Sequence, residues 1–530
     1  MKKVLSLCLA LALTASLFYA PAMAISESAE AESVQTVVKA FLQSYTESTL
    51  LNTERDLTIN TVYDAAVPMT MAEETTFELT SGTVTLSDMQ KNISYIEEKA
   101  DFLKAAREAQ DITRTDLELN YVFSDVSIDG NTASATVSET ASFYYTGETQ
   151  QSFAETIYTV DLIKVQGTWL IADVYDNDWF DDTYKASADT FSAAATMEDL
   201  EAAQASDACD IQLLEDESMS RTTASYQIPY NANSATAYAY TYTRQNSTEP
   251  WEDYYNQDFV DFRSDGGDCM NFASQCMWAG FSGSQTRANI DAHNIPMDSD
   301  GTTAEYKWYS CSKDNEDTRL SNSTGSWRSC SAFRTYIGNS NASSDIGLKC
   351  NTADVAAGAN FSGVTTTALK GAVCHVTGSG PNYGHAIVLT DVNGLARNQI
   401  YLCAHYTDRK YVLLGDYYAT CPIKAFMPQY LRVSTSPSNY LMVDMLRPIS
   451  RGNTGALRCY TSAAQYKFTI GVTAPSGAFE HKSSTAANPT SFTYNYNFTE
   501  NGLYKIDCYS KSTSTSDAQT VTFYVLCYTI

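Results

Sequence analysis

The sequence predicts a multidomain protein of the α+β class, built from three folded regions. The chain has 530 residues, a length that suits about three domains. Apolar residues of the first region follow helical spacing and then strand alternation. A stretch of small and polar residues separates this region from the second. We therefore expect an N-terminal α+β cone over 32–182, a central α+β domain over 226–435 and a C-terminal β-sandwich over 440–530.

The chain is strongly acidic. It has 62 Asp and Glu residues against 34 Lys and Arg residues, which gives a net charge of −28. Nucleic acids and anionic membrane surfaces attract basic proteins, so this charge argues against both as partners. The composition suits a well-solvated exported protein, and it does not indicate an oligomeric state.

Residues 1–24 have the pattern of a secretory signal peptide. Lys2 and Lys3 precede an apolar run over 4–20, and Ala22-Met23-Ala24 forms a small-x-small cleavage site. Cleavage after Ala24 would release a secreted protein. No later stretch has the length of a membrane span, so we expect no membrane insertion.

The first region begins with two helical patterns. Their apolar residues are Val34, Val37, Val38, Phe41, Leu42 and Tyr45, then Leu86, Met89, Ile93, Ile96, Ala100 and Leu103. Strand patterns follow over 117–126, 133–145, 156–165 and 169–175. Helices followed by a meander predict helices packed on one concave sheet. This arrangement is similar to cystatin-like and nuclear transport factor-like domains.

Two polar segments follow the meander. The first is an acidic cluster, typical of a solvated domain end and alternatively of a calcium site: Asp173, Asp176, Asp178, Asp181 and Asp182. The second, over 186–223, is rich in Ala, Ser, Thr, Asp and Glu and predicts a linker with a short helix near 197–205.

The central region is organised around a cysteine. Gly266 and Gly267 allow a sharp turn, and Asp268 is a good N-cap, so Cys269 becomes the first residue of a helix. The apolar face of this helix contains Phe272, Cys276 and Ala279, and Gly280 is placed to end it. The positive end of the helix dipole favours the thiolate, which is the nucleophilic form. The alternative is a small apolar residue in a first helical turn.

Two of the five histidines suit the base that a cysteine nucleophile needs. His385 starts an apolar strand, and His405 ends the next one. A turn centred near Leu395 would place them opposite each other, with Cβ atoms about 4.5–5.5 Å apart. We expect His385 to be the base and His405 to orient it, with Asp408 as the alternative third member. His385 could alternatively be a satisfied strand-end histidine.

Three motifs resemble those of the putative amidase domain family of secreted bacterial domains. Residues 266–276 read Gly-Gly-Asp-Cys-x-Asn-Phe-x-Ser-Gln-Cys, residues 384–388 read Gly-His-Ala-x-Val, and residues 405–408 read His-x-Thr-Asp. The resemblance implies a papain-like fold, related to NlpC-like and CHAP-type cell-wall peptidases. The family tends to carry a tryptophan where Trp327 lies, so we expect Trp327 and Asp268 near the substrate or the oxyanion.

The third region contains four alternating runs with intervening turns. The runs cover 466–472, 491–498, 504–509 and 520–528, and this spacing predicts a small β-sandwich. No catalytic residue is expected there.

The cysteine count bears on disulfides and metals. Of 13 cysteines, Cys8 falls in the signal peptide; with Cys269 set aside eleven remain, so at least one more is free or pairs between chains. Two pairs are plausible disulfides by proximity: Cys311 with Cys330, and Cys508 with Cys527. No CxxC or CxxH spacing suggests zinc, and no metal or cofactor is implied.

These features predict a secreted cysteine amidase or peptidase. Cys269 attacks an amide carbonyl, His385 transfers the proton, and the backbone N–H of Cys269 stabilises the oxyanion. The expected substrate is a peptide or N-acyl amide, with peptidoglycan stem peptides implied by the family resemblance. Two alternatives remain open: an inactive surface-binding or adhesive protein, and an acyltransferase that uses the same residues.

Overall fold

The computed structural model describes most of the chain after the predicted signal peptide. The described residues are 29–66, 72–79, 82–176, 178–185, 190–206, 208–214, 226–245, 254–265, 268–282, 307–311, 317–342, 347–377, 383–433, 441–461 and 463–529. Residues 1–24, which are predicted to be a signal peptide, and Gly266–Gly267 lie outside them. The chain divides into two compact units. The first comprises the described residues up to Glu108 with Thr113–Ala141 and Glu155–Met197, and the second comprises Ala109–Ile112, Ser142–Ala154 and the chain from Glu198 onward.

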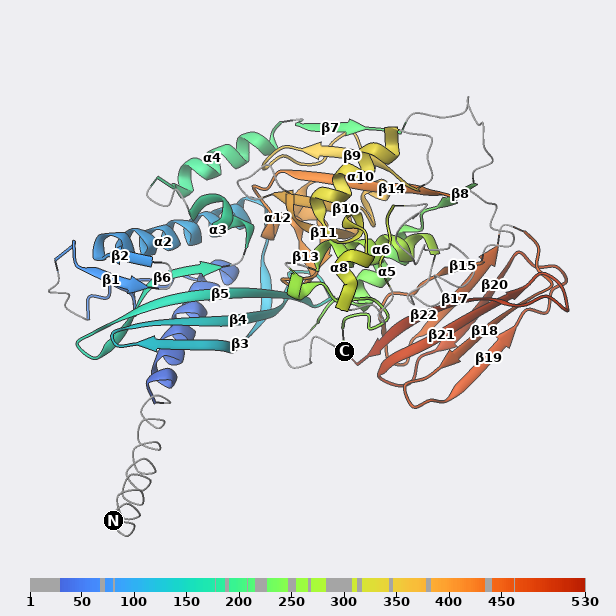
Figure 1. Cartoon of the computed structure of the whole chain (residues 1–530), viewed down its shortest axis with the longest axis horizontal. Helices are drawn as coiled ribbons and strands as arrows, with labels where there is room; N and C mark the ends of the chain where they lie inside the picture. The colour runs from blue at the N-terminus through green and yellow to red at the C-terminus, as the bar shows by residue number, and fades with distance from the viewer. Residues whose placement is uncertain are drawn as a thin grey trace, which may run out of the picture. The chain divides into compact units, whose positions relative to one another are not determined.

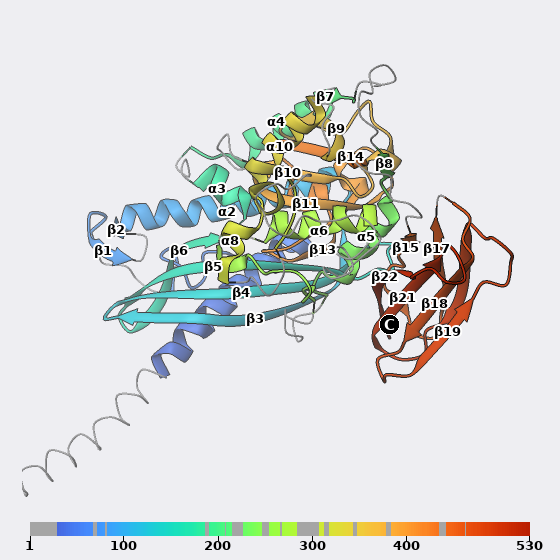
Figure 2. The same cartoon turned by 45° about the vertical axis from the view of Figure 1, so that its right-hand side comes forward.

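The first unit combines two long helices with a meander of strands (Figure 1). A helix over 29–51 and α2 (Leu86–Ala109) bury the two apolar faces predicted from the sequence. Between them lies the hairpin of β1 (Thr76–Leu79) and β2 (Gly82–Thr85). The predicted strands are confirmed as β3 (Arg114–Asp129), β4 (Thr132–Tyr145), β5 (Ser152–Val165) and β6 (Thr168–Asp176). Both views show α2 beside β6 (Figure 2).

The acidic cluster at the end of β6 differs from the expected solvated surface. Asp176 and Asp181 are 6% and 4% exposed, and α3 (Trp179–Tyr184) carries the second of them. Lys99 of α2 reaches between them, with Nζ 2.6 Å from Asp176 Oδ2 and 2.8 Å from Asp181 Oδ1. The two carboxylates are therefore buried because they share a buried ammonium group.

An antiparallel sheet forms the centre of the second unit. Its strand order is β13 (Arg409–Leu413), β12 (Ile400–Ala404), β11 (Tyr383–Val392), β10 (Val373–Thr377), β14 (Ile423–Val433), β9 (Gly347–Val355) and β7 (Cys209–Gln212). A further strand, β8 (Tyr226–Pro229), pairs with the end of β14. Most residues of these strands are buried, as expected for a sheet inside a domain.

Three longer helices pack around this sheet. α5 (Ala232–Thr241) and α6 (Cys269–Ser282) contact each other and β11, while α10 (Cys330–Ala342) contacts β9 and β11. Among the described residues of this region there are also four short helices: α8 (Arg319–Asn322), α9 (Gly325–Arg328), α11 (Thr366–Leu369) and α12 (Leu414–Tyr417). α6 and α10 therefore both contact β11.

The C-terminal residues form two small sheets. One contains β15 (Leu441–Asp444), β17 (Thr454–Thr461) and β20 (Ser491–Asn497). The other contains β16 (Ile449–Ser450), β22 (Gln519–Tyr528), β21 (Gly502–Lys511), β18 (Lys467–Thr473) and β19 (Phe479–Ser483). Figure 2 shows these strands at the C-terminal end of the chain. The four predicted alternating runs correspond to β18, β20, β21 and β22.

Neither of the two predicted disulfides is formed. In the β21–β22 ladder Cys508 pairs with Val521, whereas Cys527 pairs with Gly502 at the other end. Cys508 instead contacts Cys459, which faces it from the other small sheet. Cys311 packs with Val260 and Phe262, and Cys330 lies beside Cys269. All twelve cysteines after Cys8 are free thiols.

Part of the range predicted to be a linker is folded. α4 (Ala193–Gln204) buries Leu200 beside Gly358, and β7 pairs with β9. Few apolar residues are needed here, because the backbone of β7 gains its hydrogen bonds from a sheet edge. No helix among the described residues is both long enough and apolar enough to cross a lipid bilayer.

Candidate active site

Cys269 is the first residue of α6, as the sequence predicts. The described residues from Asp268 to Phe281 are buried on every face of the helix, and Cys269 itself is 7% exposed. Gly280 does not end α6, which continues to Ser282. A Cβ at position 280 would lie 2.2 Å from the Tyr230 ring, so this glycine permits close packing instead.

The polar residues of the cysteine motif hold α6 in place. Asn271 donates to the Val260 carbonyl and accepts from the Trp327 indole at 2.7 Å. Ser274 accepts from the Trp308 indole and donates to the Trp327 carbonyl at 2.8 Å. These bonds satisfy polar groups that burial would otherwise leave costly. The motif therefore fixes the position of the helix that carries the cysteine.

His385 lies beside Cys269. It is the third residue of β11 and half-buried, with its ring centroid 6.2 Å from that of Tyr418. The pKa of the Cys269 thiol lies well below its ordinary value. A hydrogen bond from the Cys330 thiol is the largest cause, followed by the His385 imidazole and the backbone N–H of Ala386, and together they outweigh the opposing effect of burial. The predicted Cys–His pair is therefore assembled in the structure.

Cys330 is the site residue that the sequence reasoning missed. It is the first residue of α10 and 6% exposed, and its contact with the Cys269 thiol raises its own pKa well above the ordinary value. Of the two thiols, Cys269 is the one that ionises, because only Cys269 also faces His385 and the Ala386 N–H. No motif marks Cys330. The odd cysteine count was the single signal of a second free thiol.

The predicted pairing of His405 with His385 is not observed. In the ladder between β11 and β12, Cys403 pairs with Val388 and Leu402 pairs with Leu389. Extended by two residues, this register places Ala386, and not His385, opposite His405. Neighbouring residues of a strand point to opposite faces, so a difference of one residue moves the side chain to the other side of the sheet.

His405 has other partners. Its Nδ1 lies 3.2 Å from Asp268 Oδ2, and its Nε2 bonds to the Tyr242 carbonyl. The ring stacks on Phe272 with centroids 3.8 Å apart. The two ring nitrogens of His405 are therefore both engaged, one by a carboxylate and one by a backbone carbonyl. His405 therefore anchors the residue before the cysteine.

The observed hydrogen bonds of Asp268 agree only in part with its predicted roles as helix cap and oxyanion neighbour. Its backbone carbonyl accepts from Phe272 N–H at 2.9 Å, which opens the helix. Its carboxylate is 1% exposed and is bound by the Phe262 N–H, the Asn271 amide and His405. Burial raises its pKa, and these bonds offset part of that rise. This acceptor is committed to the core, so it does not supply an oxyanion donor.

Trp327 is also a core residue. It is fully buried, its ring stacks on Phe259 with centroids 6.0 Å apart, and its only donor bonds to Asn271. It is not placed to contact a substrate. Its place in the sequence is explained by the support that it gives to α6.

The third member of the catalytic set is not visible among the described residues. Within them, His385 Nε2 is buried and has no hydrogen-bond partner. The described part of the chain also contains no group of three or more His, Cys, Asp and Glu side chains arranged to hold a metal ion. The described residues thus contain a cysteine–histidine pair, Cys269 with His385, and a second thiol beside Cys269.

Comparison with known proteins addresses the central region. Residues 229–426 match the family model described as "Putative amidase domain". The match confirms the resemblance based on the cysteine and histidine motifs, and it indicates amidase-type hydrolysis. The matched segment contains Cys269, His385 and His405.

Two solved structures are similar to smaller parts of the chain. The Kfla4162 protein from Kribbella flavida is 14% identical, over 28% of this chain and 93% of that chain, with a TM-score of 0.16. A conserved protein from Planctomyces limnophilus is 14% identical, over 27% of this chain and 98% of that chain, also with a TM-score of 0.16. No curated protein matches the sequence.

Proposed function

We propose that the amidase domain is a cysteine amidase or peptidase of papain-like fold that hydrolyses the amide bond of a peptide or N-acyl amide. The observation that carries this proposal is the lowered pKa of the Cys269 thiol beside His385. A thiolate at a helix start next to an imidazole is the arrangement that nucleophilic catalysis requires.

In the proposed first step, the Cys269 thiolate attacks the carbonyl carbon of the amide. The carbonyl oxygen becomes an oxyanion, and the backbone N–H of Cys269 is one donor to it. When the intermediate collapses, the C–N bond breaks and His385 gives its proton to the leaving amine. An acyl-enzyme remains on the cysteine sulfur.

In the second step, water releases the acyl group. His385, now neutral, takes a proton from the water, and the oxygen attacks the thioester carbon. The carboxylic acid leaves, and the Cys269 thiolate is restored. The adjacent Cys330 thiol donates to that thiolate, which stabilises the enzyme form that begins and ends the cycle.

The substrate and the location belong to the same proposal. The signal-peptide pattern supports export, and the family resemblance supports peptide bonds of peptidoglycan as the target. The strongly acidic chain is compatible with a soluble exported hydrolase.

Incubation with purified peptidoglycan, followed by mass spectrometry of the released fragments, tests this function. Wild type should release fragments with new amino or carboxyl ends, and Cys269→Ala should release none. Cys276→Ala is the matched control, because Cys276 lies in the same helix and its pKa is raised by burial. Equal release by wild type and Cys269→Ala would rule out the cysteine mechanism.

The same experiment separates hydrolysis from the two alternatives. An added amine that appears in the products would identify an acyltransferase. Reaction of Cys269 with a cysteine-directed electrophile, without release from peptidoglycan or from model peptides, would favour an inactive binding protein or a different substrate.

A further inference from the structure

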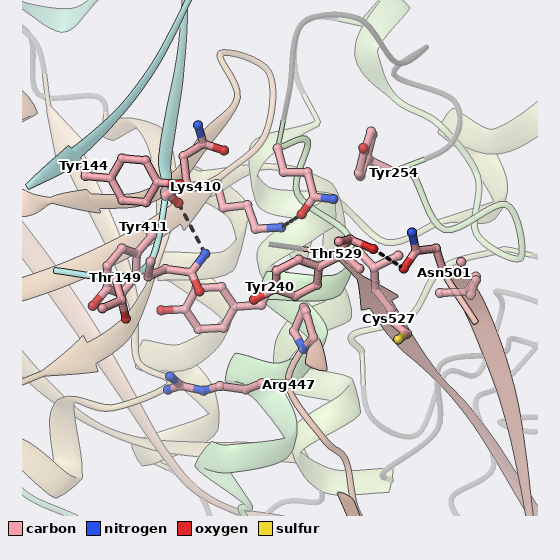
Figure 3. A pocket seen from close by; sticks show the side chains of 18 of the residues that line it. Tyr144, Thr149, Tyr240, Tyr254, Lys410, Tyr411, Arg447, Asn501, Cys527 and Thr529 are labelled. Carbon is pink, nitrogen blue, oxygen red and sulfur yellow. Dashed lines mark hydrogen bonds between the residues drawn. The ribbon is translucent and has the colours of Figure 1, made fainter. Parts of the chain in front are cut away.

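A cavity of about 910 Å³ lies in the second unit, apart from the proposed catalytic residues (Figure 3). Its walls come from the amidase domain, the C-terminal strands and the segment that precedes β5. Neither Cys269 nor His385 lines it. The volume falls in the range of about 300–1,000 Å³ that is typical of small-molecule sites.

The wall on the amidase side is held rigid by its own bonds. Arg447 makes two hydrogen bonds to Asp391, at 2.9 and 2.5 Å, and its guanidinium lies 4.7 Å from the Tyr240 ring centroid. The Tyr240 hydroxyl also donates to Asp391, and Lys410 donates to Gln245 at 3.0 Å. The charged groups of the cavity are thus engaged with protein partners: Arg447 and Asp391 neutralise each other, and Lys410 is bound to neutral acceptors.

Other lining groups are available. Within the described residues, no hydrogen bond involves the side chains of Tyr144, Thr149, Gln151 or Tyr528. Tyr144, Gln151 and Tyr528 are half-buried, and Thr149 is exposed. Three hydroxyls and one amide therefore present donors and acceptors to the cavity without competition from the protein.

Tyrosine is the most frequent residue type of the lining. The five are Tyr144, Tyr240, Tyr254, Tyr411 and Tyr528. Aromatic faces attract C–H groups because the ring quadrupole is negative at the face. A pyranose ring offers such C–H groups on its flat face and hydroxyls, which both donate and accept, at its edge. Hydroxyl and amide side chains match those edges.

We propose that this cavity binds a neutral oligosaccharide of pyranose units. Tyrosine rings would stack on the sugar faces, and the free hydroxyls of Tyr144, Thr149 and Tyr528 would bond to sugar hydroxyls. The Gln151 amide both donates and accepts, which suits an N-acetyl group. This inference does not depend on the proposed hydrolysis, because the cavity and the catalytic residues are separate.

Isothermal titration calorimetry of the full chain with chitotetraose, the tetramer of N-acetylglucosamine, tests the proposal. Titration into Cys269→Ala keeps binding separate from any turnover, so a failure of the proposed hydrolysis leaves this result unaffected. Saturable binding is expected. Tyr144→Ala and Tyr528→Ala should each weaken binding about three- to tenfold, as expected for the loss of one aromatic contact.

Two further variants complete the test. Gln151→Ala removes one polar side chain with little risk to folding and should also weaken binding. Tyr466→Ala is the matched control, because Tyr466 is a 52% exposed tyrosine of the same C-terminal region that does not line the cavity. No binding, equal loss in Tyr466→Ala, or unchanged affinity in all three cavity variants would overturn the proposal. Binding of tetra-alanine that is weakened by the same cavity variants would also overturn the proposal.

Discussion

Two cysteines of α6 show how position decides the chemistry of a thiol. Cys269 and Cys276 are both buried, yet the pKa of Cys269 is lowered and that of Cys276 is raised well above its ordinary value. Burial and the neighbouring Cys403 thiol raise the pKa of Cys276, whereas Cys269 faces an imidazole, a thiol donor and a backbone N–H. Burial alone opposes ionisation, and specific donors reverse that effect.

Alkylation should therefore separate the two thiols. Iodoacetamide should modify Cys269 at a rate that stays high as pH falls from about 9 to about 6, because its thiolate persists below the ordinary thiol pKa. Cys276 should remain unmodified in the folded protein. Peptide mass spectrometry after timed exposure measures both sites. Labelling of Cys269 that is no faster than that of Cys276 would contradict the nucleophile assignment.

Replacement of Cys330 tests the thiol contact. Cys330→Ala removes the largest cause of the lowered pKa of Cys269. The alkylation rate of Cys269 should then fall at about pH 6 while it recovers toward wild type at higher pH, where the thiolate forms without help. Cys350→Ala serves as control, since this buried cysteine has a raised pKa and is not among the groups that affect Cys269. An unchanged pH profile in Cys330→Ala would show that the second thiol has no such effect.

His405 is expected to stabilise the folded state of the second unit. His405→Ala leaves the Asp268 carboxylate buried without its imidazole partner, so the free energy of unfolding should fall by about 3–5 kcal/mol. Adding Asp268→Asn should recover part of that loss, because it removes the uncompensated charge. Urea unfolding of both variants measures this. An additive, larger loss in the double variant would show that the pair is not coupled.

The surroundings of Cys269 could be predicted only in part from the sequence. The glycines, the cap and the apolar spacing predicted a helix that starts at Cys269, and the histidine before an apolar run predicted the imidazole that lies beside this thiol. The partner of His405 was predicted wrongly, because the actual register differs by one residue and β-bulges of the kind seen between Leu389 and Asp391 leave no mark in apolar alternation. Cys330 comes from a third segment, and no local pattern encodes such a long-range contact.

At the scale of elements, α6 and α10 each contain a glycine, and the space around the two glycines differs. Gly280 of α6 faces Tyr230, whose ring atoms would lie 2.2–2.9 Å from an added Cβ. Gly338 of α10 is exposed, and nothing lies within 4 Å of its added Cβ. The same substitution is therefore expected to have opposite effects.

Gly280→Ala should destabilise the second unit by about 1–3 kcal/mol, because the added methyl group overpacks a buried contact. Gly338→Ala should stabilise α10 by up to about 1 kcal/mol, because alanine has the higher helix propensity. Thermal unfolding of the two variants beside wild type checks both signs. Stabilisation by Gly280→Ala would show that Tyr230 moves aside without cost.

At the scale of the whole molecule, the first unit carries a pH-sensitive carboxyl group in its core. Glu139 is 4% exposed, and the Thr46 hydroxyl lies 2.9 Å from both of its oxygens. Burial raises its pKa to about 7. Between the ordinary value and about 7 the folded state binds more protons than the unfolded state, so this group lowers stability as pH rises through that window.

Glu139→Gln should remove this dependence. The variant should be more stable than wild type at about pH 8, by about 3 kcal/mol for a shift of this size, and should differ little at about pH 4. Differential scanning calorimetry at both pH values, with the transition of the first unit followed, provides the measurement. Equal stability of both proteins at about pH 8 would mean that Glu139 ionises in the fold without penalty.

The burial of α6 from Cys269 to Phe281 has a consequence for how the proposed nucleophile can be lost. A helix that is enclosed on every side exchanges its amide hydrogens with solvent only when the structure around it opens. The amides of α6 should therefore be among the slowest of the second unit to exchange, and their rates should follow its global unfolding. Heat inactivation of the proposed enzyme would then be a property of the whole unit: the Cys269 thiol remains beside His385 until the surrounding core opens, and local fraying of α6 would not separate them first.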